Sequence, residues 1–211
     1  MARFVFIGGL MDAERLVLFV DAQNFYNSAR RAFFPDEESH VPGQFDPIAL
    51  GKLLCLQTPI PVKPILHQVR IYTGRPDPNK EPFAYAAHMR QCSAWEKSGA
   101  CVIARPLRYL SDWPSSKAQQ KGVDVAIAID FVSFAIDGGY DIGIIASLDT
   151  DLRPALEYVR SKCNSKCRIK VASWKSRTTN IRLDIPGDKV WCHWLNYIDY
   201  QSIADNRDYR T

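Results

Sequence analysis

Short apolar runs alternate along the chain with longer segments of helical character, and this alternation constrains the fold more than any other feature of the sequence. The runs typical of strands occupy residues 16–20, 65–72, 100–105, 141–147 and 168–173, with a possible sixth at 189–195. The helical segments occupy residues 24–33, 46–56, 83–97, 123–135 and 151–162. Strands that alternate with helices of about ten residues or more form a parallel sheet with right-handed crossovers. The sequence therefore predicts an α/β fold with a central, mainly parallel sheet covered by helices on both sides.

The length of 211 residues fits one globular domain, because a domain of this size buries roughly 70% of the surface that its unfolded chain exposes. Hydrophobic residues make up 46% of the chain and charged residues 24%, which excludes a disordered or fibrous protein. The apolar runs are shorter than the ~18 residues of a membrane-spanning helix, so we expect no membrane partner. We divide the chain into an N-terminal extension (1–14), the domain (15–195) and a polar C-terminal tail (196–211).

The N-terminal residues lack the cleavage motif of a secretory signal, and Met11 is an alternative start of the chain. The six cysteines do not have the spacing of a disulfide framework, which favours free thiols in a cytoplasmic protein. A zinc site is the less favoured alternative, because its first spacing is loose and its last two ligands are adjacent. Its ligands would be Cys163, Cys167, Cys192 and His193.

Four aspartates occur where the predicted sheet would place a ligand. Asp21 directly follows the first strand, and Asp149 and Asp151 follow the fourth. Asp124 lies in the first turn of the helix that precedes the fourth strand. Ligands of open parallel sheets bind beyond the carboxyl ends of the strands, near the point where the strand order reverses. A fold that places the first and fourth strands side by side would therefore bring all four carboxylates together.

Four carboxylates in one cleft repel one another at neutral pH unless a divalent cation neutralises them. Hard oxygen ligands suit Mg²⁺ or Mn²⁺, which activate water and stabilise the charge that develops during phosphodiester hydrolysis. Each acid also has a structural alternative. Asp149 or Asp151 could cap the following helix, Asp124 could complement a helix dipole, and Asp21 could end its strand in a turn.

Four further residues are candidates for supporting this site. Asn24 could cap its helix or hold Asp21 and a metal-bound water, and the Ser147 hydroxyl could donate to a carboxylate or a phosphate. Lys121 could contact the scissile phosphate or balance the acids. Asp130 lies six positions after Asp124, about 240° around a helix, which favours a structural role for it.

Three blocks of sequence resemble the NYN domain, a branch of the PIN-like nuclease superfamily. Residues 17–25 resemble its apolar strand followed by Asp-Gly-x-Asn, and residues 121–130 its Lys-Gly-x-Asp helix with a later Asp. Residues 140–152 resemble its strand that ends in Ser-Gly-Asp-Ser-Asp-Phe. The resemblance implies a three-layer PIN-like α/β sandwich and a Mg²⁺- or Mn²⁺-dependent ribonuclease. By motif position it implies metal ligands at Asp21, Asp124, Asp149 and Asp151, supported by Asn24 and Ser147, and it gives Asp130 a recurrent family position.

The sequence departs from the family pattern at three positions. Ala22 stands where the family usually has Gly, and Leu148 and Leu152 replace the Gly and Phe of the last block. Leu148 would weaken activity if its position needs a positive φ or close approach of phosphate to the backbone. The motifs do not cover residues 34–47, 106–120 or the tail, and we assign substrate choice to these segments as a hypothesis.

The net charge of +4 identifies no partner, but the basic residues are unevenly distributed. Residues 153–182 hold nine basic residues and one acid, as a polyanion-binding surface or a solvated face would. Single-stranded RNA suits such a surface, because its bases can stack on aromatic side chains. The candidate phosphate contacts are Arg153, Lys175, Arg177 and Arg182. The candidate stacking residues are Trp113 and Trp174, each of which could instead belong to the core.

Three functions are compatible with these patterns. The favoured one is a metal-dependent ribonuclease that hydrolyses RNA phosphodiester bonds. The alternative is a catalytically inactive module that binds RNA or a nucleotide through the same fold. A metal-dependent phosphatase that acts on small phosphate esters is the third and weakest.

Overall fold

The computed structural model describes residues 13–163 and 167–211, so most of the predicted N-terminal extension and the alternative start at Met11 lie outside it. Six strands are present: β1 (Arg15–Asp21), β2 (Ile65–Arg75), β3 (Cys101–Pro106), β4 (Ile142–Ala146), β5 (Arg168–Trp174) and β6 (Trp191–Leu195). The helices are α1 (Ala22–Phe33), α2 (Pro47–Gln57), α3 (Pro82–Ser98), α4 (Val123–Ile136), α5 (Arg153–Cys163), α6 (Tyr197–Ile203) and the short 3₁₀ helix η1 (Thr150–Leu152).

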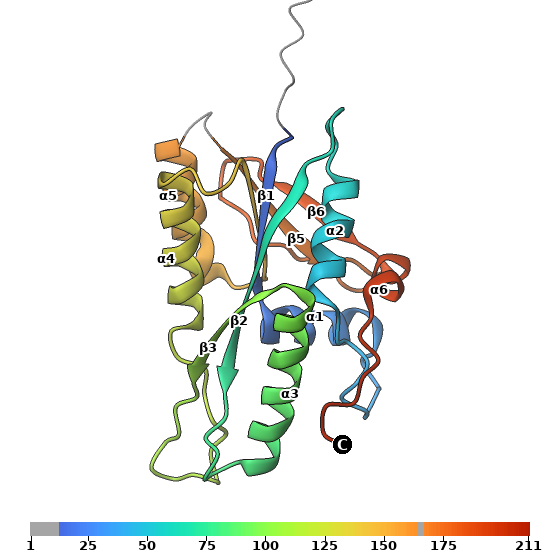
Figure 1. The fold of residues 1–211 in the computed structure, drawn as a ribbon, viewed down its shortest axis with the longest axis vertical. Helices are drawn as coiled ribbons and strands as arrows, with labels where there is room; N and C mark the ends of the chain where they lie inside the picture. Colours follow the sequence, from blue (N-terminus) through green and yellow to red (C-terminus); the bar gives the residue numbers. More distant parts are fainter. Residues whose placement is uncertain (1–12, 164–166) are drawn as a thin grey trace, which may run out of the picture.

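The six strands form one sheet in the order β3-β2-β1-β4-β5-β6, and every neighbouring pair is parallel (Figure 1). The chain moves outward from β1 to β3, returns to place β4 beside β1, and moves outward again to β6. Strand order therefore reverses between β1 and β4, where Leu16 pairs with Ile142. This confirms the predicted α/β class and the parallel sheet, and it places the first and fourth strands side by side.

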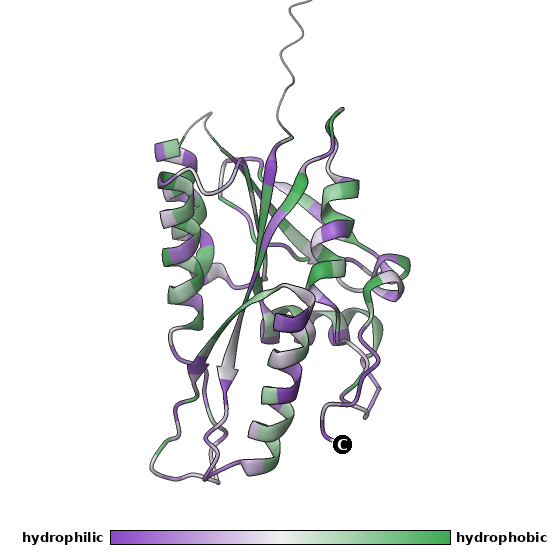
Figure 2. Cartoon of the chain, in the orientation of Figure 1, coloured by the Kyte–Doolittle hydropathy of each residue, from purple (hydrophilic) through white to green (hydrophobic). Residues whose placement is uncertain are grey.

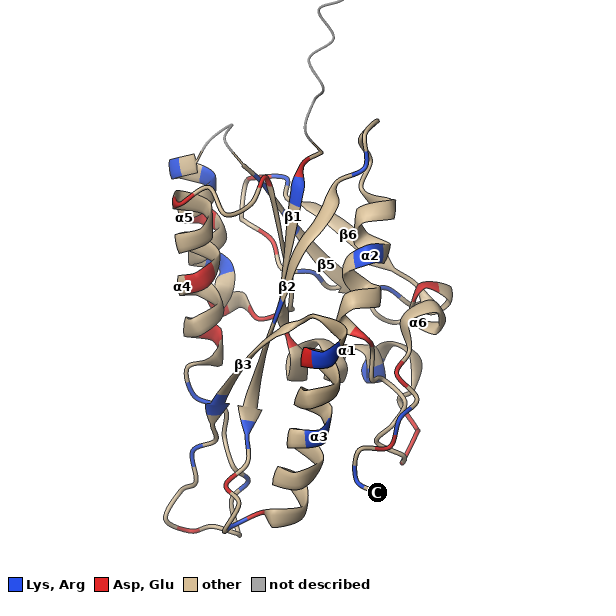
Figure 3. Ribbon diagram, in the orientation of Figure 1, with Lys and Arg blue, Asp and Glu red and all other residues tan. Residues whose placement is uncertain are grey.

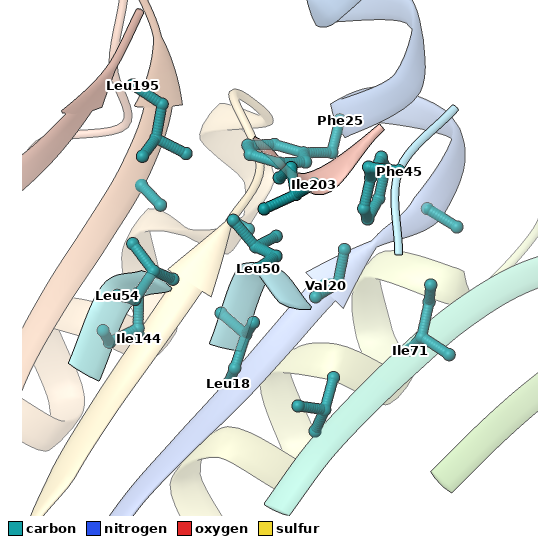
Figure 4. Close-up of a cluster of buried hydrophobic side chains, with 14 of the residues drawn as sticks. Leu18, Val20, Phe25, Phe45, Leu50, Leu54, Ile71, Ile144, Leu195 and Ile203 are labelled. Carbon is teal, nitrogen blue, oxygen red and sulfur yellow. The ribbon is translucent and has the colours of Figure 1, made fainter. Parts of the chain in front are cut away.

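Helices cover both faces of the sheet and give it the expected three layers (Figure 1). In β1 the side chains alternate between two cores, with Leu18 and Val20 facing α1, α2, α3 and α6, and Val17 and Phe19 facing α4 and α5. Strands buried on both faces are nearly continuous in apolar residues, as Figure 2 shows for the centre of the sheet. Figure 4 shows the first core, where Leu50 of α2 lies near Leu18.

Strand β2 is longer than the sequence pattern predicts. The pattern ends the strand at Tyr72, but the ladder to β3 continues through the pairs Thr73–Ala104, Gly74–Arg105 and Arg75–Pro106. Local turn chemistry is overridden here because a neighbouring strand supplies hydrogen-bond partners to the backbone. The extension carries Arg75 and Arg105 to the carboxyl edge of the sheet.

The segment predicted as a tail is packed against the domain. Asn196 caps α6 in a reciprocal capping box with Asp199. Beyond the helix, Ala204 forms a β-bridge with Phe45, and the hydroxyl of Tyr200 accepts a hydrogen bond from the Gly43 N–H at 2.8 Å. The tail thus ties itself to the 34–47 segment, which has no regular helix or strand of its own.

Helix α4 is apolar on nearly all sides. Val123, Ile127 and Phe131 are buried against the sheet, whereas Val125 and Ile129 on the outer side are exposed. Despite such apolar stretches, none of the helices in the described ranges is both long and apolar enough to cross a membrane.

Candidate active site

The predicted acids gather at the carboxyl edge of the sheet, at the point where strand order reverses. Asp21 ends β1, and Asp149 follows β4 on the adjacent strand. By the alternation along β1, Asp21 faces the α4 side of the sheet, and Asp124 lies in the first turn of α4. Asp149 and Asp124 both lie near enough to Asp21 to repel its charge. The structure therefore places three of the four predicted ligands close enough for the charges of Asp149 and Asp124 to act on Asp21.

Asp21 is the most strongly perturbed member of this group. Asp21 is only 6% exposed, and its carboxylate caps α1 by accepting a hydrogen bond from the Asn24 N–H at 3.0 Å. The pKa of Asp21 is raised to about 6, because burial and then the negative charges of Asp149 and Asp124 raise it more than the Asn24 N–H and the Ser147 hydroxyl lower it. A carboxylate kept in this environment is stabilised by any cation that binds beside it.

Asn24 and Ser147 link the two strand ends that carry the acids. The Asn24 side-chain oxygen accepts a hydrogen bond from the Leu148 N–H at 2.9 Å, and the buried Ser147 hydroxyl accepts one from the Asp149 N–H at 3.1 Å. The Ser147 hydroxyl also lies close enough to Asp21 to lower its pKa. Both side chains therefore connect the ends of β1 and β4. The backbone N–H of Leu148, one of the positions that differ from the family pattern, donates to Asn24.

Asp149 and Asp151 differ in their surroundings. Asp149 caps η1, since its Oδ1 accepts a hydrogen bond from the Asp151 N–H at 2.9 Å. Asp149 is therefore a helix cap, which is the structural alternative to a metal ligand. Its Oδ2 has no hydrogen-bond partner among the described residues. Asp151 is exposed beside it and is not among the charges that act on Asp21.

The four carboxylates match Mg²⁺ or Mn²⁺ in donor type and in the negative charge that such an ion would neutralise. Within residues 13–163 and 167–211, however, no three acidic, histidine or cysteine side chains are close enough to hold a metal ion between them. In Asp21 and in Asp149, one carboxylate oxygen accepts a hydrogen bond from a backbone N–H at the start of a helix. Ion binding would therefore require these side chains to turn toward one another.

The start of α4 depends on a glycine. Gly122 is the N-cap residue, with φ of +72°, a left-handed conformation that side chains with a Cβ rarely adopt. This turn presents Asp124 in the first helical turn, half-buried. The neighbouring Lys121 is exposed, next to the acids in sequence and free to meet solvent.

Asp130 does not join the site. Its carboxylate pairs with the Arg70 guanidinium at 2.6 Å and accepts a hydrogen bond from the Tyr72 hydroxyl at 2.7 Å. These contacts fasten α4 to β2. These contacts agree with the structural role that the helical angle of Asp130 favoured.

The two predicted stacking tryptophans are not equivalent. Trp174 is fully buried, its Nε1 donates to the Phe25 carbonyl at 3.0 Å, and its ring packs on Phe25 with centroids 4.7 Å apart. The prediction that Trp174 stacks on a base is wrong, because no face of its ring is open. Trp113 is half-buried and packs edge-on against Tyr109.

Three of the four predicted phosphate contacts follow β5 in the chain, whereas Arg153 begins α5 directly after η1. Arg153 is paired with Asp184, and Arg182 donates to the Val190 carbonyl at 3.4 Å. Lys175 lies 5.8 Å from the centroid of the Trp194 ring, and Arg177 is exposed. Lys175 and Arg177 are thus the more available cations of the four.

Sequence reasoning missed two cations on the other side of the acids. Arg75 and Arg105 are exposed at the carboxyl ends of β2 and β3, where Figure 3 shows the blue arrowheads. Their positions at strand ends were the available signal, but the predicted end of β2 left Arg75 in a loop. The acidic centre is therefore flanked by basic residues on both sides along the sheet edge.

The proposed zinc ligands do not converge. All six cysteines are free, and Cys163, Cys167 and Cys192 are buried in the core beneath α4 and α5. Adjacent residues of a strand point to opposite faces, so Cys192 and His193 of β6 cannot both bind one ion. These three cysteines are therefore free thiols that pack in the core.

Comparisons with known proteins agree with this architecture. The family model of the NYN domain matches residues 15–183. A protein of unknown function from Vibrio parahaemolyticus RIMD 2210633 has a similar fold, with a TM-score of 0.50 and 18% identity over 76% of this chain and 81% of that one. No curated protein sequence matches the chain. Because the family match runs from β1 into the segment before β6, the chain belongs to the NYN domain family, whose members are typically nucleases.

Proposed function

We propose that the protein is a metal-dependent ribonuclease that uses Asp21, Asp124, Asp149 and Asp151 with Mg²⁺ or Mn²⁺. One observation carries the proposal. At the reversal point of the sheet, a buried aspartate has its pKa raised to about 6 while two further carboxylates repel its charge. Such unrelieved repulsion is typical of sites that bind cations or do acid–base chemistry. Membership of the NYN family supports nuclease chemistry at this position.

The residues of the chain divide the work in this proposal. A bound divalent ion would supply an activated water and neutralise charge on the phosphate. Asp21 is held in place by the Asn24 N–H, and Asp149 and Asp124 lie close enough for their charges to act on it. Lys175 and Arg177 on one side, and Arg75 and Arg105 on the other, would draw a polyanion across the centre.

Single-stranded RNA is the substrate that we propose, because a flexible backbone can follow a sheet edge with cations at both ends. The six free thiols suit a reducing compartment, and a cytoplasmic location is part of the proposal.

The test is cleavage of an end-labelled single-stranded RNA in Mn²⁺ or Mg²⁺. We expect cleavage by the wild type, none in excess chelator, and none by Asp21→Asn. Asp137→Asn, an exposed change at the far end of α4, is the matched control and should cleave as the wild type does. Equal cleavage by the wild type and Asp21→Asn would assign the activity to a contaminant and refute the proposal.

An RNA- or nucleotide-binding module without catalysis is the second candidate. The observation that favours it is that, within the described residues, no three acidic, histidine or cysteine side chains lie close enough together to bind a metal ion. It predicts RNA binding that weakens with salt and persists in chelator, without turnover. Hydrolysis of a chromogenic phosphate ester without RNA cleavage would instead favour a phosphatase.

A further inference from the structure

A cavity of about 370 Å³ lies on the face of the sheet opposite α4. Its walls come from the start of α1, the 40–45 segment, the 73–76 segment at the end of β2, α3 and the C-terminal tail. Two of them, the 40–45 segment and the tail, belong to the segments that the family motifs leave uncovered. The cavity lies at the lower end of the range of about 300–1,000 Å³ for small-molecule sites, so it suits a ligand the size of a base or nucleoside.

The cavity adjoins the acidic centre through two strand ends. Ala22, which lines it, directly follows Asp21. Thr73, which also lines it, directly follows Tyr72, the residue of β2 that pairs with Asp21. Neighbouring Cα atoms lie roughly 4 Å apart, so the cavity wall begins one residue along the backbone from Asp21 and from its partner in β2.

Aromatic rings form much of the cavity wall. Tyr26, Phe45, Trp95 and Tyr209 all line it. Phe45, Trp95 and Tyr209 are buried, whereas Tyr26 is half-buried. None of the described residues that line the cavity is acidic. Planar, uncharged ligands bind well between such surfaces, because ring faces stack and there is no anionic group to repel them.

Polar groups in the wall offer hydrogen bonds to the edge of a ring. The buried Trp95 Nε1, which can only donate, has no hydrogen-bond partner in the described part of the chain. Gln91 donates to the side-chain oxygen of Gln44 at 3.0 Å and keeps its own oxygen available. Burial and the nearby Arg75 charge lower the pKa of His88 to about 4, so this imidazole is neutral at pH 7 and can both donate and accept.

A buried donor without a partner is unfavourable, and a ligand acceptor that reached the Trp95 Nε1 would remove this cost. We propose that this cavity binds one unpaired nucleobase of the RNA whose backbone crosses the acidic centre. The proposal rests on the proposed ribonuclease function for its substrate, and it makes cleavage selective for the base held in the cavity. The binding step can be measured without cleavage.

The first test follows the five tryptophan indole N–H signals in ¹H–¹⁵N spectra of the full chain. Each of the four ribonucleoside 5′-monophosphates is titrated in chelator, and Trp95→Phe assigns the Trp95 signal. We expect at least one nucleotide to shift this signal with a dissociation constant on the order of 1 mM or tighter. Ribose 5-phosphate, which lacks a base, should leave it in place. No shift with any nucleotide, or an equal shift with ribose 5-phosphate, would overturn the proposal.

The second test fills the cavity. Ala87 of α3 lines it, and Ala87→Leu should weaken nucleotide binding about tenfold or more and reduce the base preference of cleavage. Ala86→Leu is the matched control, because Ala86 is equally half-buried on α3 but does not line the cavity. Intact binding in Ala87→Leu, or the same loss in the control, would contradict the proposal.

These outcomes separate the two proposals. Asp21→Asn should lose cleavage and keep the Trp95 shift. If the wild type cleaves RNA without a Trp95 shift, the cavity proposal fails alone. If nucleotides shift Trp95 but no RNA is cleaved, the ribonuclease proposal fails and the cavity is a nucleotide site of a binding module.

Discussion

Asp21 does two things that oppose each other. Its carboxylate begins α1 as an N-cap, which stabilises the helix, but its burial among other acids raises its pKa to about 6 and destabilises the ionised form. The unfolded chain would ionise this side chain near pH 4. The folded protein therefore holds the proton more tightly, and its stability should fall as pH rises from about 4 to about 6 and stay lower above that.

We predict that Asp21→Asn stabilises the metal-free protein at pH 7. Asparagine caps helices as well as aspartate does, so the cap is kept while the buried charge is removed. A shift of about two pKa units corresponds to a gain of about 3 kcal/mol in the free energy of unfolding. Thermal unfolding in chelator should give a higher Tm at pH 7 and a much smaller difference at pH 4.

Asp151→Asn serves as the comparison, because Asp151 is exposed and should change Tm little. A lower Tm for Asp21→Asn than for the wild type at pH 7 would show that the ionised carboxylate is stabilising where it lies.

The sequence predicted the positions of some site residues correctly and those of others incorrectly. Asp21, Asp124 and Asp149 were predictable because the end of a buried strand and the first turn of a helix are local patterns. Trp174 was not, because its neighbours Ser173 and Lys175 suggest a strand end open to solvent. Its burial is decided by packing against rings that come from distant parts of the chain.

Helix α4 is fastened to the sheet by the contacts of Asp130 with Arg70 and Tyr72. The Arg70 side chain is only 14% exposed, so it depends on this partner. We predict that Asp130→Ala lowers the free energy of unfolding by about 2 kcal/mol, because it removes the carboxylate that pairs with a largely buried guanidinium and accepts from the Tyr72 hydroxyl. Denaturant unfolding measures the loss, with the exposed Asp137→Ala as control.

Cleavage per folded molecule provides the second measurement on Asp130→Ala. A residue that only holds the helix should leave this activity unchanged under conditions where the variant is folded. Loss of cleavage with intact stability would return Asp130 to the active site, as the family resemblance suggests.

The order and types of the strands and helices followed from the sequence, because periodicity over ten residues is a strong signal. Their ends were less predictable. The Thr73-Gly74 pair reads locally as a turn, yet β3 provides partners that extend β2 to Arg75. The start of α1 at Ala22 instead of Asn24 reflects the cap at Asp21, whose side chain could equally have ended a turn.

In the whole molecule, the C-terminal residues act as a structural part of the domain. Tyr200, Ile203 and Tyr209 are buried, and the Arg90 guanidinium donates to the Tyr209 carbonyl at 2.8 Å. Burying one large apolar side chain contributes about 1.5–3 kcal/mol, and whole domains are stable by only about 5–15 kcal/mol. The tail therefore accounts for a large share of the stability.

We predict that a chain ending at Leu195 unfolds at a markedly lower denaturant concentration than the full chain, or fails to fold. A shorter deletion that removes only Arg210 and Thr211, both exposed, is the control and should unfold as the full chain does. Equal midpoints for the chain ending at Leu195 and the full chain would mean that α6 packs without contributing stability.

The arrangement of the whole molecule was only partly predictable. Alternating strands and helices imply a parallel sheet, but they do not give the strand order, which depends on where each crossover returns. The cavity beside the acids could not be predicted, because its walls come from five separate segments and its size is set by their packing.

The adjacency of β1 and β4 has a consequence for synthesis of the protein. The bond between Asn24 and Leu148 joins residues 124 positions apart in the sequence, so the acids cannot meet until most of the chain has left the ribosome. Contacts between such distant residues form late in folding. A nascent chain, surrounded by messenger and ribosomal RNA, would carry Asp21 long before it could assemble the proposed centre, and the topology itself would delay cutting until the residues after β4 have emerged.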